Sequence, residues 1–101
     1  MTLAPGISFP TEEVTRICRR YRVNELSVFG SAARGELRPE SDIDLLVEFL
    51  PGARIGLFEL WEMGEELEAA LGRKVDLVPK GGLKPLIRPQ ILRESRVVYT
   101  A

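Results

Sequence analysis

Apolar residues recur at the spacing of an amphipathic helix in two stretches of the chain. In the first stretch, four residues share one helical face: Val14, Ile17, Cys18 and Tyr21. This spacing predicts a helix that ends near Arg22 and begins at Ser8 or Thr11, either of which can cap its first turn. In the second stretch, residues 56–71, the apolar positions that predict a buried face are Leu57, Leu60, Trp61, Gly64, Leu67 and Leu71. Gly72 is placed to end this second helix.

Three shorter apolar stretches predict β-strands, at residues 26–29, 42–50 and 74–78. The middle one alternates with period two, so one face of the strand is apolar: Ile43, Leu45, Val47 and Phe49. The opposite face carries Asp42, Asp44, Leu46 and Glu48. Pro51 and Gly52 are predicted to end this strand.

The segments between these elements contain turn residues and prolines. Gly30 predicts a tight turn into a short helix, and the polar stretch 36–41, which contains Pro39, predicts a loop. Further along, we expect a turn at 79–82, a helix at 85–94 begun by prolines, and a short strand at 97–99. Helices therefore alternate with strands along the chain. This order predicts a single α/β domain over residues 1–101 with two or three layers.

Composition narrows the class of protein. The 101 residues are 45% apolar and 29% charged, which supports one hydrophobic core. No apolar run is long enough to cross a bilayer and no signal segment precedes the first helix, so we expect a cytoplasmic protein without a membrane partner. The net charge of -1, without a basic half, argues against nucleic acid as a partner. Histidine is absent and Cys18 is the only cysteine, so any metal must be a hard cation bound by oxygen.

Three aspartates lie within the predicted strands, where this residue is depleted. Asp42 and Asp44 share one face of their strand, about 6 to 7 Å apart along it, a spacing that suits two divalent ions with shared ligands. Asp76 is in the middle of the next predicted strand and completes an oxygen site if the two strands are adjacent. The alternative is that the three carboxylates are simply solvated at the polar edge of a sheet.

A possible phosphate site precedes these acids in the sequence. Gly30 allows the backbone to approach a phosphate closely, and Ser31 adds a hydroxyl at the start of a short helix. Arg34, one turn later, is a candidate donor to a phosphate oxygen, and Ser41 is a candidate for orienting Asp42. Each has a structural alternative: a capped strand-to-helix turn for Gly30 and Ser31, a solvent-facing side chain for Arg34, and a loop cap for Ser41.

Together these residues resemble a known signature. Gly30-Ser31, ten intervening residues and then Asp42-Ile43-Asp44 is similar to the motif of the DNA polymerase β-like nucleotidyltransferases. The fuller stretches from Phe29 to Glu36 and from Ser41 to Leu45 resemble the minimal nucleotidyltransferases, small prokaryotic proteins related to the kanamycin nucleotidyltransferases. The resemblance implies a polymerase β palm-like fold, which is a small mixed β-sheet flanked by helices.

The resemblance also implies an activity. In that family three acids, here Asp42, Asp44 and Asp76, hold two Mg²⁺ ions, and a hydroxyl attacks the α-phosphorus of ATP with release of pyrophosphate. We expect Asp44 to bridge the two metals and Asp76, or water, to accept the proton of the hydroxyl. The resemblance further implies a HEPN-domain protein as partner, with this chain as the antitoxin that adenylylates a tyrosine of the toxin. Little of the chain remains to build a pocket for a small acceptor, which agrees with an acceptor on another macromolecule.

Other interpretations stay open at this stage. The alternatives are a module that binds nucleotide and masks its partner without chemistry, and a small-molecule nucleotidyltransferase of the aminoglycoside type. Its helical spacing predicts that Trp61 belongs to the core, the alternative being an exposed groove for a partner. The acidic run from Glu59 to Glu68 is predicted to be a solvated helix face.

Overall fold

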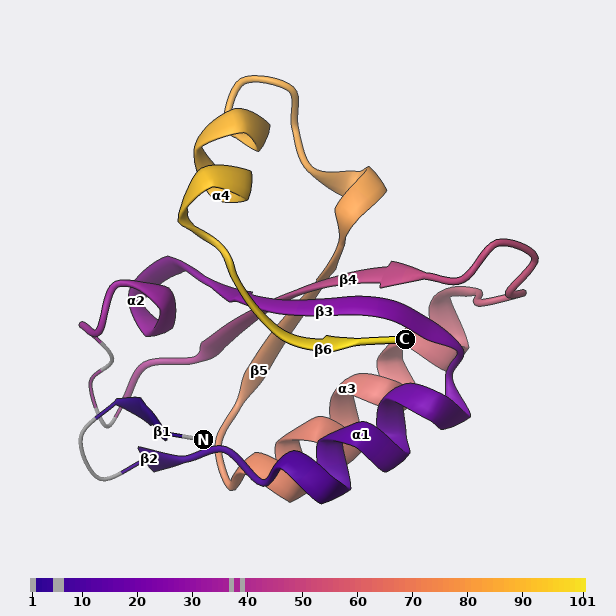
Figure 1. Cartoon of the computed structure of the whole chain (residues 1–101), viewed down its shortest axis with the longest axis horizontal. Coiled ribbons are helices and arrows are strands. Elements are labelled where there is room, and N and C mark those ends of the chain that lie inside the picture. Colours follow the sequence, from indigo (N-terminus) through magenta and orange to yellow (C-terminus); the bar gives the residue numbers. More distant parts are fainter. Residues whose placement is uncertain (1, 5–6, 37, 39) are drawn as a thin grey trace.

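A four-stranded mixed sheet organises the chain (Figure 1). The computed structural model describes residues 2–4, 7–36, 38 and 40–101. Its elements are β1 (Thr2–Ala4), β2 (Ile7–Ser8), α1 (Thr11–Arg20), β3 (Val23–Phe29), α2 (Gly30–Ala33), β4 (Ile43–Phe49), α3 (Leu57–Leu71), β5 (Val75–Pro79), the 3-10 helix η1 (Lys80–Gly82), α4 (Arg88–Glu94) and β6 (Arg96–Thr100). The sheet has the order β5-β4-β3-β6, and β1 pairs with β2 separately. The predicted α/β class and small mixed sheet are therefore confirmed.

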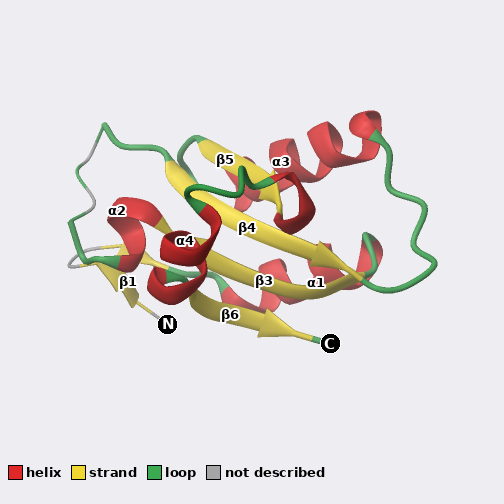
Figure 2. Cartoon of the chain, turned by 90° about the horizontal axis from the view of Figure 1, so that it is seen from above, coloured by secondary structure: helices red, strands yellow, loops and turns green. Residues whose placement is uncertain are grey.

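The pairing of the strands determines which side chains share a face. β3 runs antiparallel to both β4 and β6, whereas β4 and β5 are parallel. Figures 1 and 2 show α1 and α3 on one face of the sheet and α4 on the other. Ile43, Leu45 and Val47 of β4 are buried under α1 and α3, as the period-two pattern predicts. Asp44, Leu46 and Glu48 therefore point to the opposite face, which we call the α4 face.

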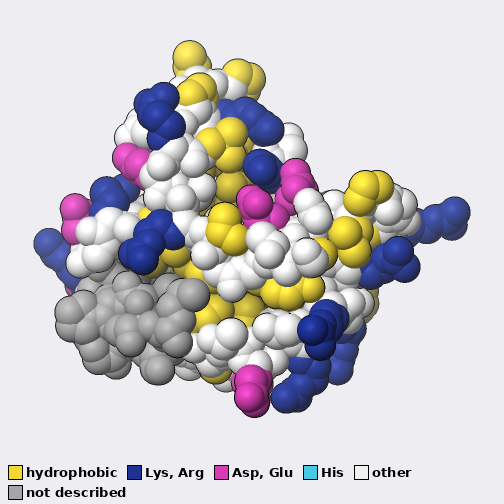
Figure 3. Space-filling model, in the orientation of Figure 1, with side chains coloured by type: hydrophobic (Ala, Val, Ile, Leu, Met, Phe, Trp, Pro, Cys, Tyr) yellow, Lys and Arg dark blue, Asp and Glu magenta, His cyan; other side chains and the backbone are white. Residues whose placement is uncertain are grey.

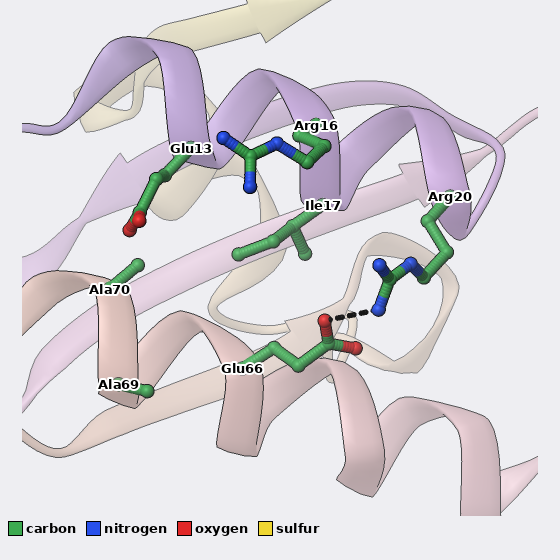
Figure 4. Close-up of a pocket in the computed structure, with 7 residues that line it drawn as sticks. All are labelled: Glu13, Arg16, Ile17, Arg20, Glu66, Ala69 and Ala70. Carbon is green, nitrogen blue, oxygen red and sulfur yellow. Dashed lines mark hydrogen bonds and ion pairs between the residues drawn. The ribbon is translucent and has the colours of Figure 1, made fainter.

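The main core lies between the sheet and the helices α1 and α3. The predicted face of α1, made by Val14, Ile17, Cys18 and Tyr21, is buried as expected. Across the surface of this layer, Arg20 Nη1 forms an ion pair of 2.7 Å with Glu66 Oε1, and the pair bridges the groove between the two helices (Figure 4). This groove is on the side of the sheet away from Asp44.

The start of α1 differs from the prediction. Pro10 occupies the N-cap position and no side chain caps the helix. Ser8 lies in β2, and Thr11 is the first helical residue, with its hydroxyl donating to the Phe9 carbonyl at 3.4 Å. Both predicted caps are therefore wrong. Proline explains the difference because its fixed φ suits the entry to a helix while it has no side-chain acceptor.

The predicted buried face of α3 is also wrong in part. Met63 and Leu67 are buried, whereas Leu57 and Trp61 are 87% and 62% exposed. The buried face runs through Leu60, Met63 and Leu67, and the first turn of α3 presents its large apolar side chains to solvent. Gly72 ends the helix with φ 71°, as predicted.

The acidic run of α3 is not simply solvated. The single hydrogen of the buried Tyr21 hydroxyl is shared between Glu62 Oε1, at 2.8 Å, and Glu66 Oε2. Glu68 Oε2 accepts from the Val75 N–H at 3.1 Å, and Glu59 accepts from the Gly56 N–H at 2.7 Å. These carboxylates fasten α3 to α1, to β5 and to its own first turn, because each accepts a hydrogen that would otherwise lack a partner.

Replacing Tyr21 by phenylalanine tests this connection. We expect the free energy of unfolding to fall by about 1 to 2 kcal/mol, because two carboxylates lose a donor. Burial, followed by the two glutamates, raises the pKa of Tyr21. The stabilising contribution of the Tyr21 hydroxyl is therefore complete below the unfolded pKa of about 10 and disappears as pH rises through the folded pKa.

Urea unfolding at neutral and alkaline pH measures the loss of stability in Tyr21→Phe and its pH dependence. Tyr99→Phe is the control, since the described residues offer its hydroxyl no hydrogen bond; an equal loss in both variants would contradict the argument.

The boundaries of the other strands and helices differ from the predicted ones by a few residues. β3 begins at Val23, three residues earlier than predicted, and β4 begins at Ile43, just after Asp42. The last helix begins at Arg88, with Pro89 in its first turn, because a proline fits only there. The strand β6 confirms the short terminal strand. Pro39, within the predicted loop, lies outside the described residues.

Residues 80–94 form a lobe on the α4 face, where η1 contacts β4 and α4 contacts α2. Leu83 of the lobe is buried, as are Ser27 of β3 and Leu46 of β4 on the same face of the sheet. At the tip of the lobe, Figure 3 shows hydrophobic side chains at the surface. Leu86 of the lobe is 96% exposed. Among the described helices, none is long and apolar enough to span a bilayer.

Candidate active site

The sheet brings two of the three candidate aspartates together. β4 and β5 are parallel neighbours, and Asp44 is the register partner of Asp76. Both side chains therefore lie on the α4 face, on adjacent strands about 4.8 Å apart. Asp42 directly precedes β4 and is exposed, two residues before Asp44. The adjacency of strands that the sequence left open is thus observed.

The Gly30-Ser31 turn is packed against the same carboxylate. On the other side of β4, Phe29 at the end of β3 is the register partner of Asp44. Gly30 follows with φ 66°, a left-handed conformation that favours glycine. A Cβ added at Gly30 would overlap Asp44 Oδ2 and would lie 3.3 Å from Asp44 Cγ. Glycine is therefore needed here both for its φ and for the space that the Asp44 carboxylate occupies.

Burial and the neighbouring charges both act on the pKa of Asp44. Burial raises the pKa of Asp44, and repulsion from Asp76 and then from Asp42 raises it further. Arg34 acts in the opposite direction and lowers it. Since the three carboxylates repel one another across a small region, a cation is favoured among them.

Arg34 is held by two carboxylates, one two residues away in the sequence and one from α4. Its Nε lies 3.2 Å from Glu36 Oε2, and its Nη1 lies 3.4 Å from Glu94 Oε2. The other oxygen of Glu94 accepts from Gln90 Nε2 at 3.2 Å. The hydrogen bond to Glu36, more than any other influence, raises the pKa of Arg34, which stays charged. Glu94 and Gln90 come from α4, some 60 residues away in sequence, and no motif in the chain marks them.

Ser41 and Ser31 have different surroundings. The Ser41 hydroxyl accepts from the Arg38 N–H at 3.3 Å, and the Ser41 N–H donates to the Arg38 carbonyl at 3.0 Å. This geometry favours the loop cap over an orienting contact with Asp42. Ser31 is half-buried in α2, next to Gly30, and its carbonyl accepts from the Glu36 N–H at 2.8 Å.

The donor set suits a hard divalent cation in chemistry but is not arranged as a finished metal site. Within the described part of the chain, no three acidic, histidine or cysteine side chains are placed so as to hold a metal ion. Carboxylate oxygens are the ligands that Mg²⁺ prefers, and their mutual repulsion at Asp44 is the kind that a divalent cation relieves. The residues present therefore fit such an ion.

Comparison with known proteins identifies the protein family. A family profile described as a nucleotidyltransferase domain matches residues 12–98. The chain belongs to this nucleotidyltransferase family. It is 43% identical over 101 residues to the protein adenylyltransferase MntA of Thermococcus cleftensis, and the match covers 98% of this chain and 96% of that protein. The fold and the resemblance expected from the sequence are thereby confirmed, and the chain is a nucleotidyltransferase by its relatives.

Solved nucleotidyltransferases share the fold. A structure described as a candidate minimal nucleotidyltransferase has 43% identity and a TM-score of 0.73, covering 85% of this chain and 86% of that one. A complex of the tri-AMPylated HEPN toxin of Shewanella oneidensis with its MNT antitoxin contains a chain with a TM-score of 0.66. That match covers 90% of this nucleotidyltransferase and 70% of the other chain. At 19% identity it shows a common fold only.

Proposed function

We propose that the protein, as a single nucleotidyltransferase domain over residues 1–101, transfers AMP from ATP to a tyrosine hydroxyl of a HEPN-domain toxin and so acts as its antitoxin. The observation that carries the proposal is the packing of the Gly30 turn against Asp44, beside Asp76 in register. This arrangement joins a backbone that can approach a triphosphate to a pair of carboxylates. The relative named a protein adenylyltransferase and the complex with an AMPylated HEPN toxin support this choice of donor and acceptor.

The roles of the residues follow from their positions. Asp42, Asp44 and Asp76 would hold two Mg²⁺ ions, which stabilise charge on the attacking and leaving oxygens when bound. Gly30 and Ser31 are proposed to contact the triphosphate through backbone N–H groups and the serine hydroxyl. The bond from the tyrosine oxygen to the α-phosphorus forms as the bond to the β-phosphate oxygen breaks, and pyrophosphate leaves. Asp76, which is exposed on β5 beside Asp44, is our candidate for accepting the tyrosine proton.

The direct test is transfer of label. The purified protein is incubated with Mg²⁺ and a HEPN-domain protein, once with ATP labelled at the α-phosphate and once with ATP labelled at the γ-phosphate. We expect the partner to become labelled only by the α-labelled nucleotide, at a tyrosine identified by mass spectrometry. Label from the γ-phosphate would indicate a kinase instead. Masking without chemistry is the second candidate, and it predicts tight binding of the partner with no label at all.

Arg34 gives a more specific prediction. Its charge lies near Asp44 and is held by Glu36 and Glu94, so we propose that it contacts the phosphates of the nucleotide. Arg34→Ala should raise the KM for ATP about tenfold, with a smaller change in kcat, because a charged hydrogen bond to the ground state is lost. Arg93→Ala, an exposed arginine of α4, is the matched control. Equal KM values for the two variants would remove Arg34 from the nucleotide site.

A further inference from the structure

The first turns of α3 expose three large apolar side chains. We call Leu57, Phe58 and Trp61 the α3 patch; Phe58 is 65% exposed, similar to Trp61. The two aromatic rings are 6.1 Å apart. Exposed aromatic residues that lie together on a small domain are typical of protein contacts, and tryptophan is enriched among the residues that dominate binding energy.

A groove adjoins the α3 patch. Its volume is 230 Å³, and it lies between α3 and β5, the edge strand of the sheet. Its apolar lining comes from Leu57, Leu60, Trp61, Val75 and Leu77. Gly64 belongs to the lining as well, and a Cβ at that position would meet nothing within 4 Å, so the helix is open there. The patch and the groove share Leu57 and Trp61, so their apolar side chains adjoin.

Two positions on the edge of β5 are unavailable to an added strand. The Val75 N–H is already taken by Glu68 Oε2 at 3.1 Å, and Pro79 at the other end of the strand has no N–H. Strand addition depends on free backbone groups along the edge, and proline blocks it. This favours an occupant that binds through its side chains, as an amphipathic helix does when it lies in an apolar groove.

The border of this surface is acidic. Glu65 lies one helical turn after Trp61 and is exposed, whereas the Glu62 carboxylate accepts from the Tyr21 hydroxyl. Glu65 also lines the groove, and no described lysine or arginine forms an ion pair with it. A helix with apolar anchors and a lysine or arginine one turn away is complementary to this pattern.

We infer that the α3 patch and its groove dock a basic amphipathic helix of the acceptor protein. The inference rests on the proposed function, which requires a protein acceptor, and it assigns the contact that holds that acceptor. Val75 of the groove and Asp76 of the candidate site are consecutive residues of the edge strand β5, with side chains on opposite faces of the sheet. A helix docked in the groove thus holds the acceptor at the edge where Asp76 is exposed.

Trp61 reports on the groove directly, because it is the only tryptophan of the chain. A tryptophan-free HEPN-domain protein is titrated into the full-length chain, and emission and quenching by acrylamide are followed. We expect a blue shift and reduced quenching, with the same shift when Asp42 and Asp44 are both replaced by asparagine. In a parallel calorimetric titration, Trp61→Ala and Glu65→Lys should each weaken binding about tenfold or more. Leu86→Ala, which truncates a large exposed apolar side chain on the lobe, outside the α3 patch, should bind as the wild type does.

The outcomes separate this inference from the proposed function. Binding with a blue shift but no transfer of label supports the docking groove and removes the proposed reaction. Transfer of label with full affinity in Trp61→Ala and Glu65→Lys supports the reaction and overturns the docking groove. Absence of binding, or a concentration-dependent dimer of the chain alone that Trp61→Ala dissociates, also overturns it, the latter in favour of a second copy. Because Trp61 is exposed, the melting temperature of Trp61→Ala should match the wild type, so that lost affinity is not lost folding.

Discussion

We expect the proposed transfer of AMP to fall by about 10³-fold or more when Asp44 is replaced by asparagine, because the change removes a charged ligand from the centre of the proposed site. Asp44 is packed under Gly30, lies in register with Asp76 and is two residues from Asp42. No other carboxylate of the site has this central position. The measurement is the initial rate of label transfer from α-labelled ATP to the HEPN-domain partner.

The same substitution should stabilise the protein without metal. Since burial and the neighbouring carboxylates raise the pKa of Asp44, its folded state favours the protonated form. The ionised form therefore costs stability as pH rises through the folded pKa, and the cost is absent below the unfolded pKa. Asparagine removes that cost at neutral pH, so the melting temperature in a metal chelator should rise by a few degrees. At acidic pH the two proteins should converge.

Glu48→Gln is the matched control for Asp44→Asn. Glu48 lies four residues along the same strand on the same face, where it accepts from Asn24 Nδ2 at 2.7 Å and lies 3.7 Å from Lys80 Nζ. Glutamine keeps the hydrogen-bond acceptor while it removes the charge. Transfer should remain within a few-fold of the wild type. Equal loss in both variants would mean that general charge on the α4 face, and not a site at Asp44, supports the reaction.

Modification and masking predict different outcomes when Asp42 and Asp44 are both replaced by asparagine. If the protein neutralises its partner by adenylylation, the Asp42→Asn and Asp44→Asn double variant binds the partner but leaves it toxic. If it neutralises by masking, the double variant protects as well as the wild type. Co-expression of each form with the partner, followed by growth, distinguishes the two candidates.

The sequence was sufficient for those parts of the structure that depend on local pattern. The period-two pattern placed Asp44 on the polar face of β4, although the strand begins only after Asp42, and the apolar stripe of α1 was buried as predicted. The site motif, with its fixed spacing, indicated Gly30 and both aspartates. These features are local because each depends on residues within one strand or one turn.

Features that depend on contacts between distant segments were not predictable. The helical period of α3 was compatible with two apolar stripes, and only its packing on the sheet selected Met63 and Leu67 over Leu57 and Trp61. The pairing of Arg34 with Glu94 requires the lobe to fold back over α2, which no local pattern specifies. Long-range packing therefore decided both the exposed surface and the partners of Arg34.

Gly30→Ala should nearly abolish transfer at a moderate cost in stability. The left-handed φ of 66° costs a residue with a Cβ about 1 to 2 kcal/mol, and that strain lowers the free energy of unfolding. The larger effect concerns the site, because the new Cβ would occupy the position of Asp44 Oδ2 and force that carboxylate to turn away. A displacement of about 1 Å in a catalytic group costs about 10²-fold in rate. Label transfer and urea unfolding measure the two effects separately.

Gly52→Ala isolates the contribution of the clash. Gly52 has φ 84°, and a Cβ there would meet nothing within 4 Å, so the backbone strain is present and the collision is not. It should lose comparable stability and keep its transfer rate. If the rate in Gly30→Ala falls only as far as in Gly52→Ala, the contact between Gly30 and Asp44 has no role in the reaction. If Gly30→Ala has no further effect in an Asp44→Asn background, the glycine acts through that carboxylate, because two residues that work as one unit are not additive.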